Sequence, residues 1–141
     1  MKNIVVYYSE TGNTEQLAEM IKNALNCEAL NVSLIDENDL LNYDNIILGC
    51  PALGAEEISD EIERLTDFLV NNLVNQKIYL FGSYGWGDGE WIRNWSDKFN
   101  GACSGILICN EGVENIDNDD FNAFIVSVQY KMGWNKKAPR C

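Results

Sequence analysis

Five short apolar runs are spaced along the chain, separated by stretches in which apolar residues recur every three or four positions. Four of the runs are almost continuously apolar, which is typical of strands that helices cover on both faces of a parallel sheet. The second run alternates between apolar and polar residues, which favours a strand at the edge of the sheet. We therefore predict five strands, at residues 3–8, 28–32, 45–50, 77–83 and 105–110.

The stretches between these runs have the spacing of amphipathic helices. The predicted buried faces are Leu17, Ile21, Ala24 and Leu25 in the first helix, Ile58, Ile62, Leu65 and Leu69 in the second, Trp91, Trp95 and Phe99 in the third, and Phe121, Phe124, Ile125 and Val128 in the last. Ser59 is a suitable N-cap for the second helix. Residues 33–44 have a weaker helical pattern. Aromatic residues at helical spacing usually belong to a core, so we assign them no chemistry.

The alternation of strands and helices predicts an α/β fold, with an open, doubly wound parallel sheet of five strands and helices on both faces. A chain of 141 residues is most simply one domain, residues 1–141, with a peripheral tail from about residue 133. Sheets of this kind bind ligands beyond the carboxyl ends of their strands. The loops that follow the strands are therefore the place to look for chemistry.

The composition narrows the classes of partner. A net charge of −12 argues against binding to nucleic acid or to an anionic membrane, and is compatible with basic protein partners, although an acidic surface also serves solubility alone. No apolar run approaches the ~20 residues that a membrane span needs, and the N-terminus is a poor signal peptide, so we expect a cytoplasmic protein. With five Cys, no C-x-x-C motif and no His, neither a disulfide framework nor a metal site is expected.

The segment "SETGNT", residues 9–14, lies between the first strand and the first helix. It lacks the Lys of a Walker A loop and the spacing of a dinucleotide-binding motif. Its donors are the hydroxyl groups of Ser9, Thr11 and Thr14, the side-chain amide of Asn13 and the backbone N–H groups next to Gly12. These donors and the helix dipole suit a phosphate group. An ordinary turn with Asn13 or Thr14 as N-cap explains the segment equally well when it is considered alone.

Two further loops follow the third and fourth strands. Residues 53–56 predict a four-residue turn in which Gly54 supplies the positive φ of a type II turn. The segment "GSYGWGDGEW", residues 82–91, surrounds Tyr84 and Trp86 with glycines. A large aromatic side chain in an exposed loop is costly unless something covers it. The cover is either a flat ligand, the neighbouring helix or a partner protein.

In this order, the segments "SETGNT", "GCPALGAEE" and "FGSYGWGDG" resemble the flavodoxins over residues 2 to about 132. The chain is similar to the short-chain members, because its fifth strand has no long insertion. The resemblance, and not the spacing, implies the strand order 2-1-3-4-5 and non-covalently bound FMN, for which flavodoxin is itself the standard example. It implies a low-potential one-electron carrier between redox proteins, not an enzyme. Together with the acidic charge, this leads us to expect a monomer with basic partners, namely reductases and acceptors.

The resemblance also implies roles for single residues. The cofactor-binding residues would be Ser9, Glu10, Thr11, Gly12, Asn13 and Thr14 at the phosphate, Pro51, Ala52, Leu53, Gly54, Ala55 and Glu56 in the second loop, Ser83, Tyr84, Gly85, Trp86 and Gly87 in the third, and Asn115 at the ribityl chain or ring edge. Trp86 and Leu53 would cover the two faces of the flavin ring, and Glu56 would accept a hydrogen bond from its N3–H. The carbonyl group of Gly54 would turn to accept a hydrogen bond from N5 after one-electron reduction.

Three positions depart from the short-chain pattern. Relatives commonly have Ser or Thr at Pro51, Met at Leu53, and Asp or Gly at Ala55. These differences bear on redox potential and affinity more than on FMN binding itself. Two alternatives share the fold and the cofactor: a quinone-reductase type of flavin enzyme, and a flavin-bearing accessory protein that activates one enzyme. A phosphorylation-dependent receiver domain fits poorly, since it needs acidic residues after the first and third strands.

Overall fold

Five parallel strands form one sheet in the order β2-β1-β3-β4-β5 in the computed structural model, which describes residues 1–54 and 56–130. The strands are β1 (Asn3–Tyr7), β2 (Glu28–Asn31), β3 (Asn45–Gly49), β4 (Lys77–Tyr84) and β5 (Cys103–Asn110). The predicted strand positions and the order 2-1-3-4-5 are confirmed. The predicted tail from about residue 133 lies outside the described residues.

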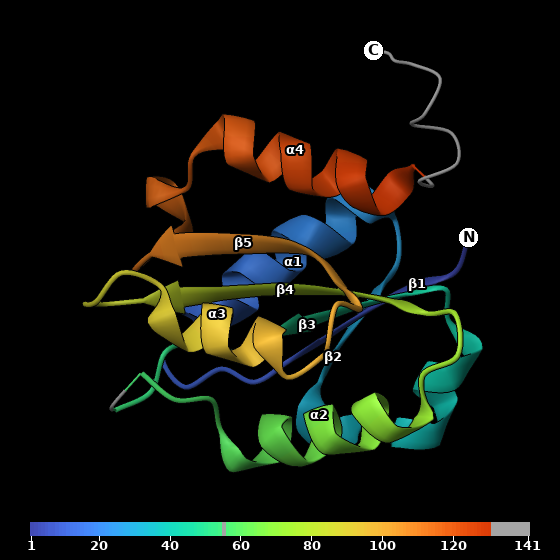
Figure 1. Cartoon of the computed structure of the whole chain (residues 1–141). Helices are drawn as coiled ribbons and strands as arrows, with labels where there is room; N and C mark the ends of the chain where they lie inside the picture. Colours follow the sequence, from blue (N-terminus) through green and yellow to red (C-terminus); the bar gives the residue numbers. More distant parts are fainter. Residues whose placement is uncertain (55, 131–141) are drawn as a thin grey trace.

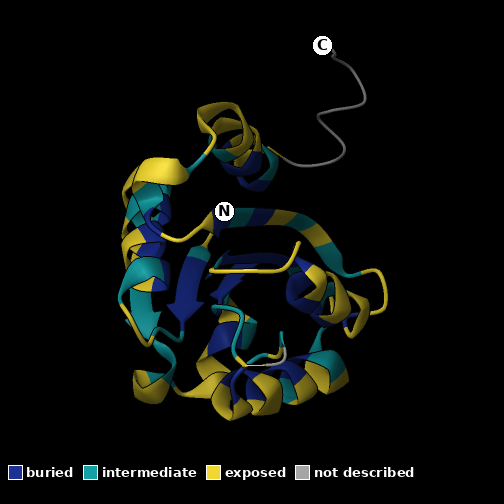
Figure 2. Ribbon diagram, turned by 90° about the vertical axis from the view of Figure 1, so that its left-hand side faces the viewer, coloured by how far each residue is buried: buried dark blue, intermediate teal, exposed yellow. Residues whose placement is uncertain are grey.

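Helices cover both faces of the sheet (Figure 1). Helices α1 (Asn13–Leu25) and α4 (Asn118–Gln129) pack on one face, and α2 (Asp60–Asn72) and α3 (Glu90–Asp97) pack on the other. Each face has its own core, one centred on the tryptophans of α3 and the other on the apolar stripes of α1 and α4. Figure 2 shows the buried residues gathered between the layers, with exposed residues on the outer faces of the helices. The fold is therefore doubly wound.

The burial of each strand follows its place in the sheet. All five residues of β3, which lies in the middle, are buried. Strand β5 lies at the edge, and its burial alternates, so that Ile106 is 41% exposed. The prediction that helices cover both faces of the fifth strand is thus wrong along part of its length. The apolar run alone did not show that β5 has a neighbouring strand on one side only.

Three local predictions need correction. Residues 33–44 form two short 3₁₀ helices, η1 (Val32–Leu34) and η2 (Glu37–Asn42), instead of an α-helix. In α1, Ala18 is buried, whereas Ala24 is exposed. The N-cap of α1 is Gly12, with φ +97° and no side-chain cap, rather than Asn13 or Thr14. Ser59 is confirmed as the N-cap of α2, since its Oγ accepts a hydrogen bond from the backbone N–H of Ile62 at 3.2 Å.

No helix within residues 1–54 and 56–130 is long and apolar enough to cross a membrane. The loops that follow β1, β3, β4 and β5 meet at one edge of the sheet, on the left in Figure 1. This is the edge where parallel sheets bind their ligands.

Candidate functional site

A cleft of about 250 Å³ opens at this edge between the loops after β1, β3, β4 and β5. Its lining residues are Glu10, Thr11, Asn13, Pro51, Ala52, Leu53, Ser83, Tyr84, Gly85 and Glu111. All of them except Glu111 belong to the three segments that the sequence singled out. The structure therefore brings the three loops together around one space.

The loop after β1 is organised by the side chain of Ser9. The Oγ of Ser9 accepts hydrogen bonds from the backbone N–H groups of Gly12 and Glu15, both at 3.2 Å. The first N–H groups of a helix have no partner within the helix. Ser9 satisfies two of them, which leaves the N–H groups of Asn13 and Thr14 at the positive end of the α1 dipole. The geometry suits an anion next to those two groups.

Thr14 and Ser83 tie this loop to the end of β4. The two side-chain hydroxyl groups are hydrogen-bonded at 2.9 Å, and both residues are buried. The resemblance places both hydroxyl groups against a ligand, which stays a prediction. In the structure they fix the helix N-terminus to the fourth strand, across 69 positions of sequence.

The loop after β3 is a turn closed by two backbone hydrogen bonds between Leu53 and Glu57, each 2.9 Å long. The predicted turn over residues 53–56 is therefore one residue too short. Gly54 has φ +32°, as the prediction of a positive φ required, but Glu56 also has a positive φ, +56°. A non-glycine residue rarely adopts this conformation. Ala55 lies outside the described residues.

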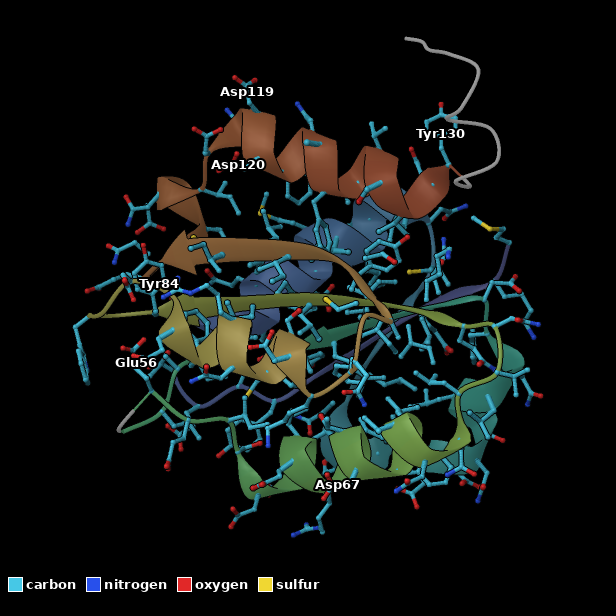
Figure 3. The ribbon with its side chains drawn as sticks, viewed as in Figure 1. Glu56, Asp67, Tyr84, Asp119, Asp120 and Tyr130 are labelled. Atoms are coloured by element: carbon cyan, nitrogen blue, oxygen red, sulfur yellow. The ribbon has the colours of Figure 1, made fainter. Side chains whose placement is uncertain are left out.

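Glu56 has an unusual position for a carboxylate. Its Oε1 is buried and has no hydrogen-bond partner, the only such side-chain atom in residues 1–54 and 56–130. A Cβ on Gly87 would lie 2.6 Å from the carboxyl carbon of Glu56, so the glycine makes room for this side chain. A buried acceptor without a partner costs free energy, roughly 1–3 kcal/mol. Figure 3 shows Glu56 and Tyr84 at the same edge of the sheet. This acceptor is suited to an N–H donor of a bound molecule.

The loop after β4 leaves Trp86 largely uncovered, with 66% of its surface exposed. Tyr84, by contrast, packs its ring on Trp91, with ring centroids 5.7 Å apart and an angle of 42° between the planes. Gly87 and Gly89 have φ of +86° and +95°, values that few other residues adopt. The sequence left a flat ligand, the neighbouring helix or a partner protein as possible covers for these two aromatic residues. The neighbouring helix covers Tyr84, and Trp86 remains available to a ligand or a partner.

The loop after β5 contributes a residue that sequence reasoning missed. Glu111 has φ +63°, its N–H donates to the carbonyl of Tyr84 at 2.9 Å, and its side chain lines the cleft. The sequence signal was available, since Glu111 directly follows the fifth strand at the ligand edge. Asn115, which lies in η3 (Val113–Asn115), donates its side-chain amide to the carbonyl of Asn110 at 2.9 Å. It is not among the residues that line the cleft.

Buried hydrogen bonds of Cys50 hold the start of the loop after β3 in place. The carbonyl of Cys50 accepts a hydrogen bond from Nε1 of Trp91 at 3.1 Å, and the thiol of Cys50 accepts one from the N–H of Ser59 at 3.4 Å. Burial raises the pKa of the Cys50 thiol to about 11. Gly82 is required here, because a Cβ would lie 2.1 Å from the carbonyl oxygen of Cys50. Cys50 and Cys109 are both buried.

The electrostatic character of the edge is acidic. Two tyrosines at the end of β1 donate to carboxylates, Tyr8 to Glu10 at 3.1 Å and Tyr7 to Glu15 at 3.3 Å. The hydrogen bond to Glu10 is the main reason that the pKa of Tyr8 is raised, whereas burial is the main reason for Tyr7. No Lys or Arg is among the described residues that line the cleft. The described residues also contain no cluster of His, Cys, Asp and Glu suited to a metal ion.

Comparison with known proteins shows which family the chain belongs to. The model of the flavodoxin family matches residues 5–127. The chain is 41% identical over 103 residues to a flavodoxin of Clostridium beijerinckii, covering 69% of this chain and 75% of that protein. It is 39% identical over 120 residues to a flavodoxin of Megasphaera elsdenii, covering 79% and 88%.

A solved structure agrees with these matches. The solution structure of two-electron reduced Megasphaera elsdenii flavodoxin superposes with a TM-score of 0.80 at 33% identity, covering 91% of this chain and 99% of that one. FMN carries a phosphate group and a ring with an N–H donor. The free N–H groups at the start of α1 fit the phosphate, and the unpartnered Oε1 of Glu56 fits the ring N–H. The chain belongs to the flavodoxin family, whose members bind FMN and carry electrons rather than catalyse a reaction of their own.

Proposed function

We propose that the loop of residues 9–14 holds the FMN phosphate at the backbone N–H groups of Asn13 and Thr14, and that Leu53 and Trp86 cover the two faces of the flavin ring. The observation that carries this assignment is the pairing of two groups at one edge of the sheet: unpaired helix N–H groups for an anion, and the buried, unpartnered oxygen of Glu56 for the ring N3–H. The remaining candidates are Ala52, Pro51, Tyr84 and Gly85, which line the cleft, and Gly87, which makes room for Glu56. Thr14 and Ser83 hold the two loops together.

FMN supplies the electron-accepting ring, and the protein tunes how readily that ring accepts charge. The cleft is lined by the carboxylates of Glu10 and Glu111 and by no Lys or Arg among the described residues. A carboxylate ~10 Å from a second negative charge raises its free energy by ~1–2 kcal/mol at an effective dielectric constant of about 20, before screening. Since ~1.4 kcal/mol corresponds to ~59 mV for one electron, a few such charges lower the potential by the order of 100 mV. These carboxylates favour a low-potential carrier.

The proposed partners are basic redox proteins. The chain itself is proposed to be a monomer of one domain in the cytoplasm. The net charge of −12 and the exposed carboxylates near the cleft, including those of Glu10, Glu57, Asp88 and Glu111, support electrostatic steering toward a basic surface. If so, the rate of electron transfer to a basic haem protein falls steeply as ionic strength rises. A rate that rises with ionic strength contradicts this assignment of partner charge.

The site assignment is tested by titrating the flavin-free chain with FMN, riboflavin and FAD. We expect one FMN per chain, and affinity for riboflavin lower by on the order of 100-fold or more, because two or more charge-assisted hydrogen bonds to the phosphate are lost. FAD is expected to bind weakly, since the adenylate has to pass the loop. Equal affinities for FMN and riboflavin rule out the phosphate assignment.

A further inference from the structure

A carboxylate stands inside the segment that is proposed to hold a phosphate. Glu10 is exposed and lines the cleft together with Thr11 and Asn13. Two like charges in one small site repel each other, and here no Lys or Arg among the described lining residues offsets the repulsion. Glu10 follows Ser9, whose hydroxyl already occupies two helix N–H groups. Glu10 and Asn13 line the same cleft, and a carboxylate is itself an anion suited to the helix N–H groups that remain.

Tyr8 restrains this carboxylate. Its hydroxyl donates to Oε2 of Glu10 at 3.1 Å, and its ring packs against the core on the α2 and α3 side of the sheet. The backbone of Tyr8 is also fixed, because its N–H donates to the carbonyl of Gly49 at 2.9 Å. A hydroxyl that hydrogen-bonds one carboxylate oxygen and is anchored at both ring and backbone limits the directions that the carboxylate can take.

On the basis of the proposed position of the phosphate, we propose that Glu10 weakens phosphate binding by charge repulsion. Tyr8 acts as a positioning residue and keeps the Glu10 carboxylate away from the N–H groups of Asn13 and Thr14. The pair sets how strongly this chain prefers a phosphorylated flavin over one without a phosphate. Glu10 acts on the phosphate directly, and Tyr8 acts only through Glu10. Neither residue affects the binding of the flavin ring.

The experiment compares four full-length chains freed of flavin: wild type, Glu10→Gln, Tyr8→Phe and the double variant. Dissociation constants for FMN and riboflavin are measured by flavin fluorescence at low and high ionic strength. Glu28→Gln is the matched control, because it removes the same charge from an exposed residue at the start of β2, at the opposite end of the strands. Tyr8→Phe keeps the ring and removes only the hydroxyl.

We expect Glu10→Gln to tighten FMN binding about three- to tenfold at low ionic strength and about twofold or less at 0.5 M salt, since salt screens exposed charges. Riboflavin binding stays unchanged, and Glu28→Gln has a much smaller effect on FMN. Tyr8→Phe is expected to weaken FMN binding about two- to threefold, because the freed carboxylate competes for the helix N–H groups. In the Glu10→Gln background this loss disappears.

Each outcome has one meaning. Unchanged or weaker FMN binding by Glu10→Gln overturns the role of Glu10. A Tyr8→Phe loss that persists in the double variant, or that is equal for riboflavin, shows that the Tyr8 hydroxyl acts through packing and overturns its positioning role. If wild type binds FMN and riboflavin equally, the proposed phosphate site itself fails, which is a result distinct from both.

Discussion

The loop after β1 and the loop after β4 lie at the same edge of the sheet but are built in opposite ways. The first is held by the two hydrogen bonds of the Ser9 hydroxyl and by the buried pair of Thr14 and Ser83. The second presents Trp86 to solvent, with glycines at positive φ after it. The loop after β1 is therefore the preformed half of the site. The loop after β4 is the exposed half, in which Trp86 becomes buried only when the ligand binds.

The two loops contribute differently to the free energy of flavin binding and to the stability of the flavin-free chain. A preformed anion site pays little ordering entropy when the phosphate binds. An exposed tryptophan contributes little to the folded chain alone, so its burial against a ring appears in the binding constant. Substitutions in the first loop should change both stability and the preference for phosphate. Substitutions in the second loop should change binding to any flavin.

The largest expected effect is that of Trp86→Ala. The variant should lose about 1–3 kcal/mol of binding free energy for FMN and for riboflavin alike, in line with the stacking of an aromatic side chain on a ring. It should also reduce the quenching of flavin fluorescence and leave the unfolding free energy of the flavin-free chain unchanged, because Trp86 is 66% exposed.

The control for Trp86 is Val74→Ala, which truncates a side chain that is 81% exposed and follows α2, outside the cleft. It should change neither binding nor quenching. An unchanged dissociation constant in Trp86→Ala would mean that the tryptophan contacts only a partner protein, and the contrast between the two loops would then not hold.

The second effect concerns the buried support of the site and depends on pH. The pKa of the Cys50 thiol is raised to about 11 from its ordinary value of 9. The folded chain therefore favours the neutral thiol, so this stabilisation is complete below pH 9 and is lost as pH rises from about 9 to 11. The unfolding free energy should fall by about 2 kcal/mol over this range from Cys50 alone.

Cys50→Ala should remove that part of the pH dependence, measured by chemical denaturation between pH 8 and 11. Cys103→Ala, which removes a thiol elsewhere in the chain, should not. Some slope should remain in both variants, because the pKa values of Tyr7, Tyr8 and Tyr79 are also raised. Equal slopes in wild type and Cys50→Ala would show that this thiol does not couple to folding.

The third effect tests the preformed half of the site. Thr14→Val removes one partner of the buried pair at 2.9 Å and leaves the Ser83 hydroxyl without its bond. The unfolding free energy of the flavin-free chain should fall by about 1–2 kcal/mol, and FMN binding should weaken more than riboflavin binding. Thr14→Ser, which keeps the hydroxyl, should behave like wild type in both measurements. A greater loss for riboflavin would place Thr14 at the ring.

The sheet could be predicted well from the sequence. Parallel strands that are buried on both faces have nearly continuous apolar sequences, and the helices between them have apolar residues every three or four positions. It predicted less of the site's internal geometry. The bond between Thr14 and Ser83 joins residues far apart in sequence, and no local pattern shows that two hydroxyl groups will face each other. Glu111 was missed for another reason: no motif contains it, although its position directly after the fifth strand places it at the ligand edge.

The turn after β3 shows a different limit. Glycine at residue 54 predicted a positive φ correctly, since glycine tolerates it best. The positive φ at Glu56 could not be predicted, because a carboxylate residue adopts it only when the surrounding structure compensates for the cost. Here the close approach to Gly87 and the closing bonds between Leu53 and Glu57 fix that geometry.

The smallest expected effect is that of Gly54→Val. A Cβ at Gly54 would meet nothing within 4 Å, so the substitution acts through the backbone and not through a clash. If the peptide of Gly54 reorients between redox states, a β-branched residue raises the cost of the positive φ by roughly 1 kcal/mol or more. The first one-electron potential should then fall by tens of millivolts, with a smaller effect on the binding of oxidised FMN.

Gly54→Asn is the matched control, since Asn adopts positive φ more readily than Val. Both one-electron potentials of the three chains are measured at fixed pH and salt. We expect the first potential to follow the order wild type, Asn variant, Val variant, from highest to lowest. A first potential that stays within error in the Val variant, or that rises, would mean that this turn tunes the flavin without reorienting. The turn after β3 would then resemble the preformed loop after β1 more than the uncovered loop after β4.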